Sequence, residues 1–164
     1  MKSSNPNRLW AAIGLSASLI SASPLFANHD SVSETDDKAT DEAVANKVDL
    51  QMAEQAIEAK DFAKAIAVLK PLADAGKADA DVFNLLGFSH RKLGQYDIAL
   101  DYYQRALALD PKHKGANEYL GELYVETKQL AKAEERLKIL ASICADCEEY
   151  RELKEAIASS PQSQ

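Results

Sequence analysis

The sequence predicts an all-α fold of stacked helix–turn–helix repeats, and two observations support this prediction. Between Phe83 and Pro111, apolar residues recur at three- and four-residue spacing in two runs, which is the pattern of two amphipathic helices. Gly94 lies between the runs, where it suits the end of a helix. When the sequence is aligned with itself at the shift that takes Leu86 to Leu120, small residues align with small residues and apolar residues align with apolar residues. A hairpin of this size needs stacked copies to bury its apolar face.

We call this shift the repeat period, and it places the repeats. Leu86-Gly87 of the middle unit maps onto Leu120-Gly121 in one direction and onto Met52-Ala53 in the other. We therefore expect three repeats with helix contacts at equivalent positions. These predicted repeats cover residues 46–79, 80–113 and 114–147.

The middle unit has a more specific pattern. Its landmarks are Phe83-x2-Leu86-Gly87-x2-His90, then Ala99-x3-Tyr103-x2-Ala106, then Pro111. This order resembles the tetratricopeptide repeat (TPR) signature, although Phe83 stands where the family favours Trp and His90 where it favours Tyr. The resemblance implies a right-handed solenoid. It also implies that the first helix of each repeat lines a concave groove, which takes an extended peptide or a partner helix.

Two further elements follow from local signals. A capping helix is expected at residues 147–158, with Asp146 as its N-cap and Glu149 three residues later, followed by a flexible tail at 159–164. Pro71 lies inside the second helix of the first repeat. Since proline removes a backbone donor and clashes with the preceding turn, we expect a kink or an early break there.

Residues 1–27 have the composition of a secretory signal peptide. Lys2 and Arg8 precede an apolar run, and small residues lead to a cleavage site after Ala27. An uncleaved anchor is the alternative, but the apolar run is shorter than the ~20 residues of a membrane span. Residues 28–45 are acidic with almost no apolar side chains, which predicts a disordered tether. The expected localisation is periplasmic, in a bacterium, or secreted.

The chain is acidic, with 19 basic and 26 acidic residues and a formal net charge of −7. Removal of the signal peptide takes away Lys2 and Arg8, which leaves 17 basic residues against 26 acidic ones and a net charge of −9. An acidic surface without a basic stripe argues against nucleic acid and against anionic membranes as partners, and no membrane insertion is expected after signal cleavage. The predicted partner is another exported or envelope protein.

Cys144 and Cys147 form the one motif with reactive side chains. In an oxidising compartment the spacing favours a local disulfide between them. Reactive thiols and a metal-bound pair are the open alternatives, since a Cys next to a helix N-terminus loses its proton more readily. A second Cys pair or a nearby His, which a zinc site requires, does not accompany them. The prediction is therefore no metal, no cofactor and no catalytic residues, in a protein that is not an enzyme.

Candidate binding residues follow from the TPR resemblance. They occupy the first helices, one step round from the buried face, with Phe88 as an exposed aromatic flanked by Asn84 and Arg91. The alternative is that these residues only solvate the groove. The Lys, Asn and Arg clamp by which chaperone-binding TPR domains hold a C-terminal carboxylate is not matched. The predicted partner-binding residues are Leu50, Glu54, Asn84, Phe88, Arg91, Glu118 and Glu122.

The sequence thus predicts a non-catalytic protein–protein interaction module that binds a peptide segment or a partner helix in the groove, as a periplasmic scaffold or assembly factor. Its acidic walls are expected to favour a ligand with basic groups and an apolar anchor over Phe88. The alternative function is a thiol redox or metallation helper that uses Cys144 and Cys147.

Overall fold

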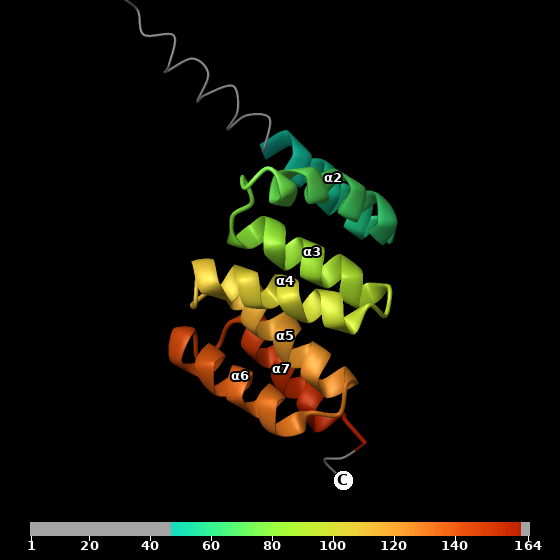
Figure 1. Cartoon of the computed structure of the whole chain (residues 1–164). Coiled ribbons are helices and arrows are strands. Elements are labelled where there is room, and N and C mark those ends of the chain that lie inside the picture. The colour runs from blue at the N-terminus through green and yellow to red at the C-terminus, as the bar shows by residue number, and fades with distance from the viewer. Residues whose placement is uncertain (1–46, 162–164) are drawn as a thin grey trace, which may run out of the picture. The chain divides into compact units, whose positions relative to one another are not determined.

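A computed structural model describes residues 47–161, and all regular structure within this range is α-helical (Figure 1). The predicted signal peptide and tether lie outside the described residues. An N-terminal helix covers residues 47–58. The helices that follow are α2 (Phe62–Asp74), α3 (Ala80–Lys92), α4 (Tyr96–Leu109), α5 (Lys114–Glu126), α6 (Leu130–Ile143) and α7 (Glu148–Ala158).

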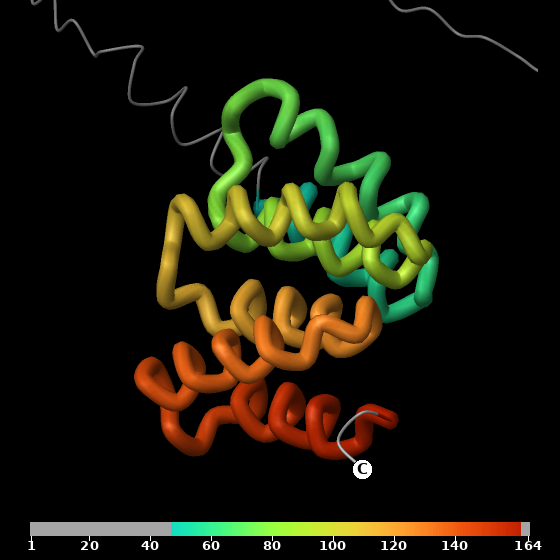
Figure 2. The backbone as a smooth tube through the Cα atoms, turned by 60° about the horizontal axis from the view of Figure 1, so that its bottom comes forward, coloured from blue at the N-terminus to red at the C-terminus, as the bar shows by residue number. Residues whose placement is uncertain are grey.

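The helices stack in chain order. α3 packs against α4 and α5 packs against α6, so each pair forms a hairpin, while α2 contacts α3 and α4 contacts α5. Figure 2 shows these hairpins lying one on another, with α7 beside α5 and α6 at the C-terminal end. α3 also contacts α5, which places the first helices of adjacent repeats side by side. The prediction of an all-α, TPR-like solenoid is confirmed.

The repeat period is visible in the backbone. Lys60, Gly94 and Lys128 are separated by the same step as Leu86 and Leu120, and they have φ of 59°, 73° and 61°. Each ends the turn between the two helices of its repeat, where a left-handed residue stops the first helix. The N-caps Asp79 and His113 show the same spacing.

Glycine is required where two helices touch. A Cβ atom on Gly87 would lie 2.6 Å from ring atoms of Tyr103, whose side chain is fully buried. A Cβ atom on Gly121 would overlap the buried side chain of Leu153. Both positions carry the small residue that the repeat period predicts, and neither leaves room for a larger one.

Pro71 does not break its helix, since α2 continues through Pro71 to Asp74, so the early break expected from the sequence is wrong. Pro71 and Ala67 are both exposed. Water can therefore reach the Ala67 carbonyl group, whose hydrogen-bond donor is missing at Pro71. Gly76, with φ of 70°, follows the end of the helix.

The C-terminal helix also starts differently from the prediction. The N-cap of α7 is Cys147, which makes no side-chain capping bond, so the capping box of Asp146 and Glu149 does not form. Asp146 lies one residue too early and its carboxylate is 3.5 Å from Arg151 Nη1. Of the predicted tail, residues 159–161 are described, and there Ser160 is only 6% exposed. No helix within residues 47–161 is long and apolar enough to cross a bilayer.

Candidate functional site

Phe88 of α3 contacts a half-buried aromatic ring on each of two neighbouring helices, Phe62 of α2 and Tyr119 of α5; we call these three residues the aromatic cluster. The ring of Phe88 lies 6.1 Å from that of Phe62, edge to face, and 4.9 Å from that of Tyr119. Lys92 Nζ lies 5.1 Å from the Phe88 ring centroid. Such rings combine a fixed position with accessible apolar surface, which is typical of anchor points for a partner.

Arg91 is buried, which corrects the prediction that it flanks Phe88 on an exposed binding surface. It is 3% exposed, and its Nη1 and Nη2 atoms donate to Glu126 at 2.6 Å and to Glu122 at 2.5 Å. The guanidinium group also lies over the Phe88 and Tyr119 rings, 5.5 and 5.7 Å from their centroids. Arg91 therefore fixes α3 to α5 and supports the aromatic cluster from within. The charge of Arg91 is therefore already paired in the free protein.

Glu118 is not part of an exposed acidic wall, because its side chain is 2% exposed. Burial raises the pKa of this carboxyl to about 9, helped by a hydrogen bond to Glu152 and by the negative charges of Glu122 and Glu149. The side chain is therefore protonated and neutral at neutral pH. Its Oε1 atom has no hydrogen-bond partner among the described residues.

The other predicted binding residues divide into two groups. Asn84 is 6% exposed, and its Nδ2 atom faces Gly115, so this residue is an internal contact and not a flank of the patch. Leu50 is half-buried and packs against the core of the first two repeats. Glu54 is exposed. Of the predicted set, the structure thus brings Phe88, Arg91 and Glu122 into one network.

Sequence reasoning did not name Phe62, Tyr119 or Glu152 as site residues. A signal for Glu152 exists, because it follows Glu118 by one repeat period and so occupies the equivalent position on α7. Phe62 opens α2, the second helix of its repeat, so a search confined to first helices could not find it.

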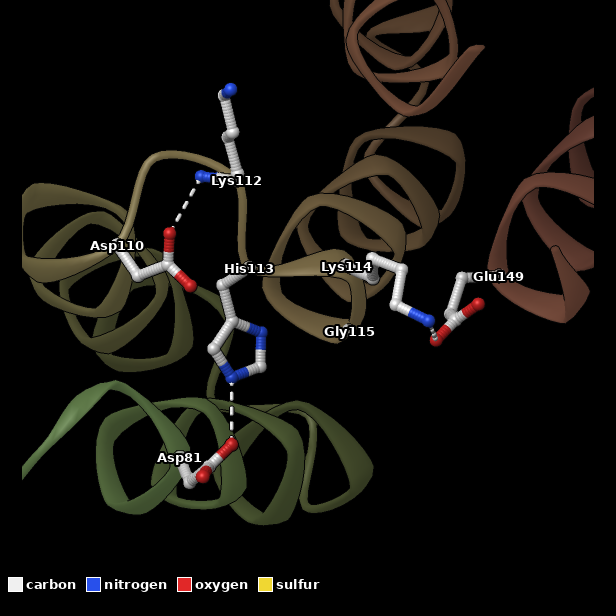
Figure 3. A pocket seen from close by; sticks show the side chains of 7 residues that line it. All are labelled: Asp81, Asp110, Lys112, His113, Lys114, Gly115 and Glu149. Carbon is white, nitrogen blue, oxygen red and sulfur yellow. Dashed lines mark hydrogen bonds and ion pairs between the residues drawn. The ribbon is translucent and has the colours of Figure 1, made fainter. Parts of the chain in front are cut away.

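An open pocket of about 300 Å³ lies between the N-terminal ends of α3, α5 and α7 (Figure 3). His113 points into it, but both ring nitrogens have structural roles. Nδ1 accepts the Ala116 N–H at 3.0 Å as the N-cap of α5, so Nε2 carries the proton and donates to Asp81 at 2.9 Å. Lys114 pairs with Glu149 at 3.3 Å across the pocket. These contacts favour a structural role for the residues that line this pocket.

The Cys144 and Cys147 sulfur atoms lie 2.10 Å apart, at bonding distance for a disulfide. The disulfide in the native compartment stays a prediction. Among the described residues, Cys144, Cys147 and Glu149 are the set whose ligand atoms all lie within 4.8 Å of one another, so a reduced pair could hold a metal ion.

Comparison with curated proteins shows one family match and short matches to relatives. Residues 80–113 match the tetratricopeptide repeat family model. The uncharacterized protein ycf37 of Guillardia theta is 36% identical over 56 residues, which are 34% of this chain and 32% of that protein. Its counterpart in Pyropia yezoensis is 38% identical over 55 residues, 34% of this chain and 31% of that protein. The chain thus spans about a third of the length of the curated relatives it matches.

Solved structures share the fold. The type III secretion translocator chaperone SycD of Yersinia enterocolitica aligns over 71% of this chain and 89% of its own, with a TM-score of 0.61 and 23% identity. SycD in complex with a peptide of the translocator YopD aligns equally well. At this identity the likeness concerns the fold alone. The chain is therefore a TPR-like solenoid in which residues 80–113 carry a tetratricopeptide repeat.

Proposed function

We propose that this chain is a non-catalytic module that binds a peptide segment or a partner helix at the aromatic cluster, and that it acts as a scaffold or assembly factor in the periplasm. The observation that carries the proposal is the contact of the half-buried Phe88 ring on α3 with Phe62 of α2 and with Tyr119 of α5. TPR-like solenoids are typical of protein interaction, and the related SycD fold has been solved with a bound peptide.

The expected binding mode follows from the charges around the rings. Glu122 and Glu126 share the single positive charge of Arg91, which leaves one carboxylate charge beside the aromatic cluster uncompensated by Arg91, while Lys92 lies over the Phe88 ring. An apolar side chain packs on the Phe88 ring, and basic groups of the same peptide lie over the acidic surroundings. The partner is accordingly an exported or envelope protein with a basic and apolar segment.

Selection from a random peptide library on the immobilised full chain tests the proposal. We expect selected peptides to bind the Phe88→Ala variant more weakly by about 2 kcal/mol or more, or roughly thirtyfold, chiefly through faster release. Tyr96→Ala is the matched control, because Tyr96 is an aromatic residue 38% exposed on α4, outside the cluster. Circular dichroism establishes that both variants fold. Equal loss in both variants, or none in either, contradicts the proposal.

A thiol redox or metallation helper remains the second candidate, favoured by the proximity of Glu149 to the two cysteines. It predicts loss of function in a folded variant with Cys144→Ser and Cys147→Ser. The peptide-binding proposal predicts that peptide affinity survives this change.

A further inference from the structure

Four glutamates gather where α7 covers α5; we call Glu118, Glu122, Glu149 and Glu152 the carboxylate cluster. Basic side chains neutralise only two of them. Glu122 pairs with Arg91 of α3 and Glu149 pairs with Lys114 of α5. Arg136 of α6 donates instead to Asn117, at 3.3 Å. Within residues 47–161, no basic side chain lies at ion-pair distance from Glu118 or Glu152.

Glu118 points to a missing cation. It is 2% exposed, yet its Oε1 atom is buried without a hydrogen-bond partner, and the exposed Glu152 helps burial to raise its pKa. Leaving a buried acceptor unpaired costs free energy, and a hydrogen bond between two carboxyl groups requires one of them to be protonated. A positively charged donor would satisfy both groups.

We propose that the carboxylate cluster is a subsite for an arginine or lysine side chain of the bound peptide. A cation beside Glu118 favours its charged form, so the entry of the basic side chain releases the proton of Glu118 into solvent. The proposal rests on the proposed function, because the same peptide occupies the aromatic cluster. Of the two unpaired glutamates, Glu152 is exposed and Glu118 is buried. Tyr119 of the aromatic cluster directly follows Glu118 on α5, and burial together with the charges of Glu118, Glu122 and Glu152 raises its pKa to about 12.

The geometry favours a basic side chain over a metal ion. Calcium requires six to eight oxygen ligands converging at about 2.3–2.6 Å. Within the described residues, the carboxylate cluster does not bring three ligand atoms within 4.8 Å of one another, whereas Cys144, Cys147 and Glu149 do. A guanidinium group has five N–H donors and can bridge carboxylates that lie further apart.

Proton release makes binding depend on pH in a defined direction. The free protein holds a proton on Glu118 at neutral pH, and the bound protein does not. Binding therefore strengthens as pH rises, by at most about tenfold per pH unit, and levels off near pH 9 where Glu118 ionises unaided. Ordinary exposed carboxylates are already ionised at neutral pH, so their attraction for a basic peptide would not increase between pH 7 and pH 9.

Glu118→Gln is the decisive variant, because glutamine reproduces the neutral carboxyl group and can donate to Glu152 but has no proton to release. Glu134→Gln, on the exposed face of α6, is the matched control. Each peptide from the library is remade with citrulline, the neutral isostere of arginine. We expect citrulline to weaken binding to the wild-type chain and to Glu134→Gln roughly tenfold or more, and Glu118→Gln to show much less discrimination.

A second probe does not need a selected peptide. Acetyl-arginine amide, added to the full chain at neutral pH, should move the carboxyl carbon signal of Glu118 toward its ionised position in NMR, and acetyl-citrulline amide should not. If peptides bind through Phe88 but tolerate citrulline, the subsite is overturned while the proposed function stands. If no peptide is selected, the proposed function fails, and the acetyl-arginine signal alone then decides whether the cluster takes a basic side chain.

Discussion

Replacing Glu118 by Gln should stabilise the protein, although Glu118 is a buried residue of α5, the helix that α7 covers. The carboxyl has an ordinary pKa of 4.5 and a raised value of about 9 in the folded chain. Between these values the folded protein holds a proton that the unfolded chain has released, so stability falls as pH rises, by up to about 1.4 kcal/mol per pH unit. Near pH 7, about 2.5 units above the ordinary pKa, the accumulated cost is roughly 3–4 kcal/mol, and glutamine avoids it.

Urea denaturation at several pH values measures this effect. We expect Glu118→Gln to be more stable than the wild type by roughly 3–4 kcal/mol near pH 7 and about equal to it near pH 4, where the wild-type carboxyl largely holds its proton in the folded and the unfolded chain alike. Glu134→Gln should follow the wild type throughout, apart from the small effect of one exposed charge. A constant difference across this range would falsify the assignment of a neutral Glu118, even if the variant were more stable.

Three other predictions concern the C-terminal end and export. Gly121→Leu should cost about 2 kcal/mol or more, because the new side chain overlaps Leu153, and denaturation should show α7 detaching first. Changing Cys144 and Cys147 to Ser should leave the helices folded by circular dichroism and cost about 2 kcal/mol or less, since the closed loop is short; thiol titration checks that the wild-type pair is oxidised. Mass spectrometry of the native protein should find Asn28 at the N-terminus, and an intact Met1 would contradict export.

The fold could be predicted because the repeats use the same positions for the same physical task. Gly87 and Gly121 are small where helices touch, and this requirement is visible in a single sequence once the period is known. The period also fixes features that composition does not reveal. Lys60 and Lys128 take the left-handed conformation although neither is glycine, because each occupies the turn position of Gly94. In a repeat protein, local spacing thus determines most of the tertiary contacts.

The charge state of the site could not be read in the same way. The repeat period aligns Arg91 with Val125, which lies between Glu122 and Glu126 in the sequence of the next repeat. The two ion pairs could therefore have been predicted from the sequence. Whether a pair is buried depends on how closely the next helix packs. Glu118 becomes buried because α7 continues the stack, with its N-cap Cys147 placed one repeat period after the N-cap His113. The sequence predicts this segment as a capping helix and not as a further copy of the repeat.

The N-terminal helix shows the limit of the repeat pattern and gives the sharpest test of it. Met52 and Leu86 occupy equivalent positions, but Leu86 is fully buried under α2 while Met52 is 44% exposed, because no described helix precedes its own. Leu86→Ala should therefore cost about 2–5 kcal/mol, and Met52→Ala less than about 1 kcal/mol. Urea denaturation with unchanged m-values decides the comparison. Equal costs would mean that the face of Met52 is covered in solution, and a dependence of stability on protein concentration would then identify a second copy of the chain as the cover.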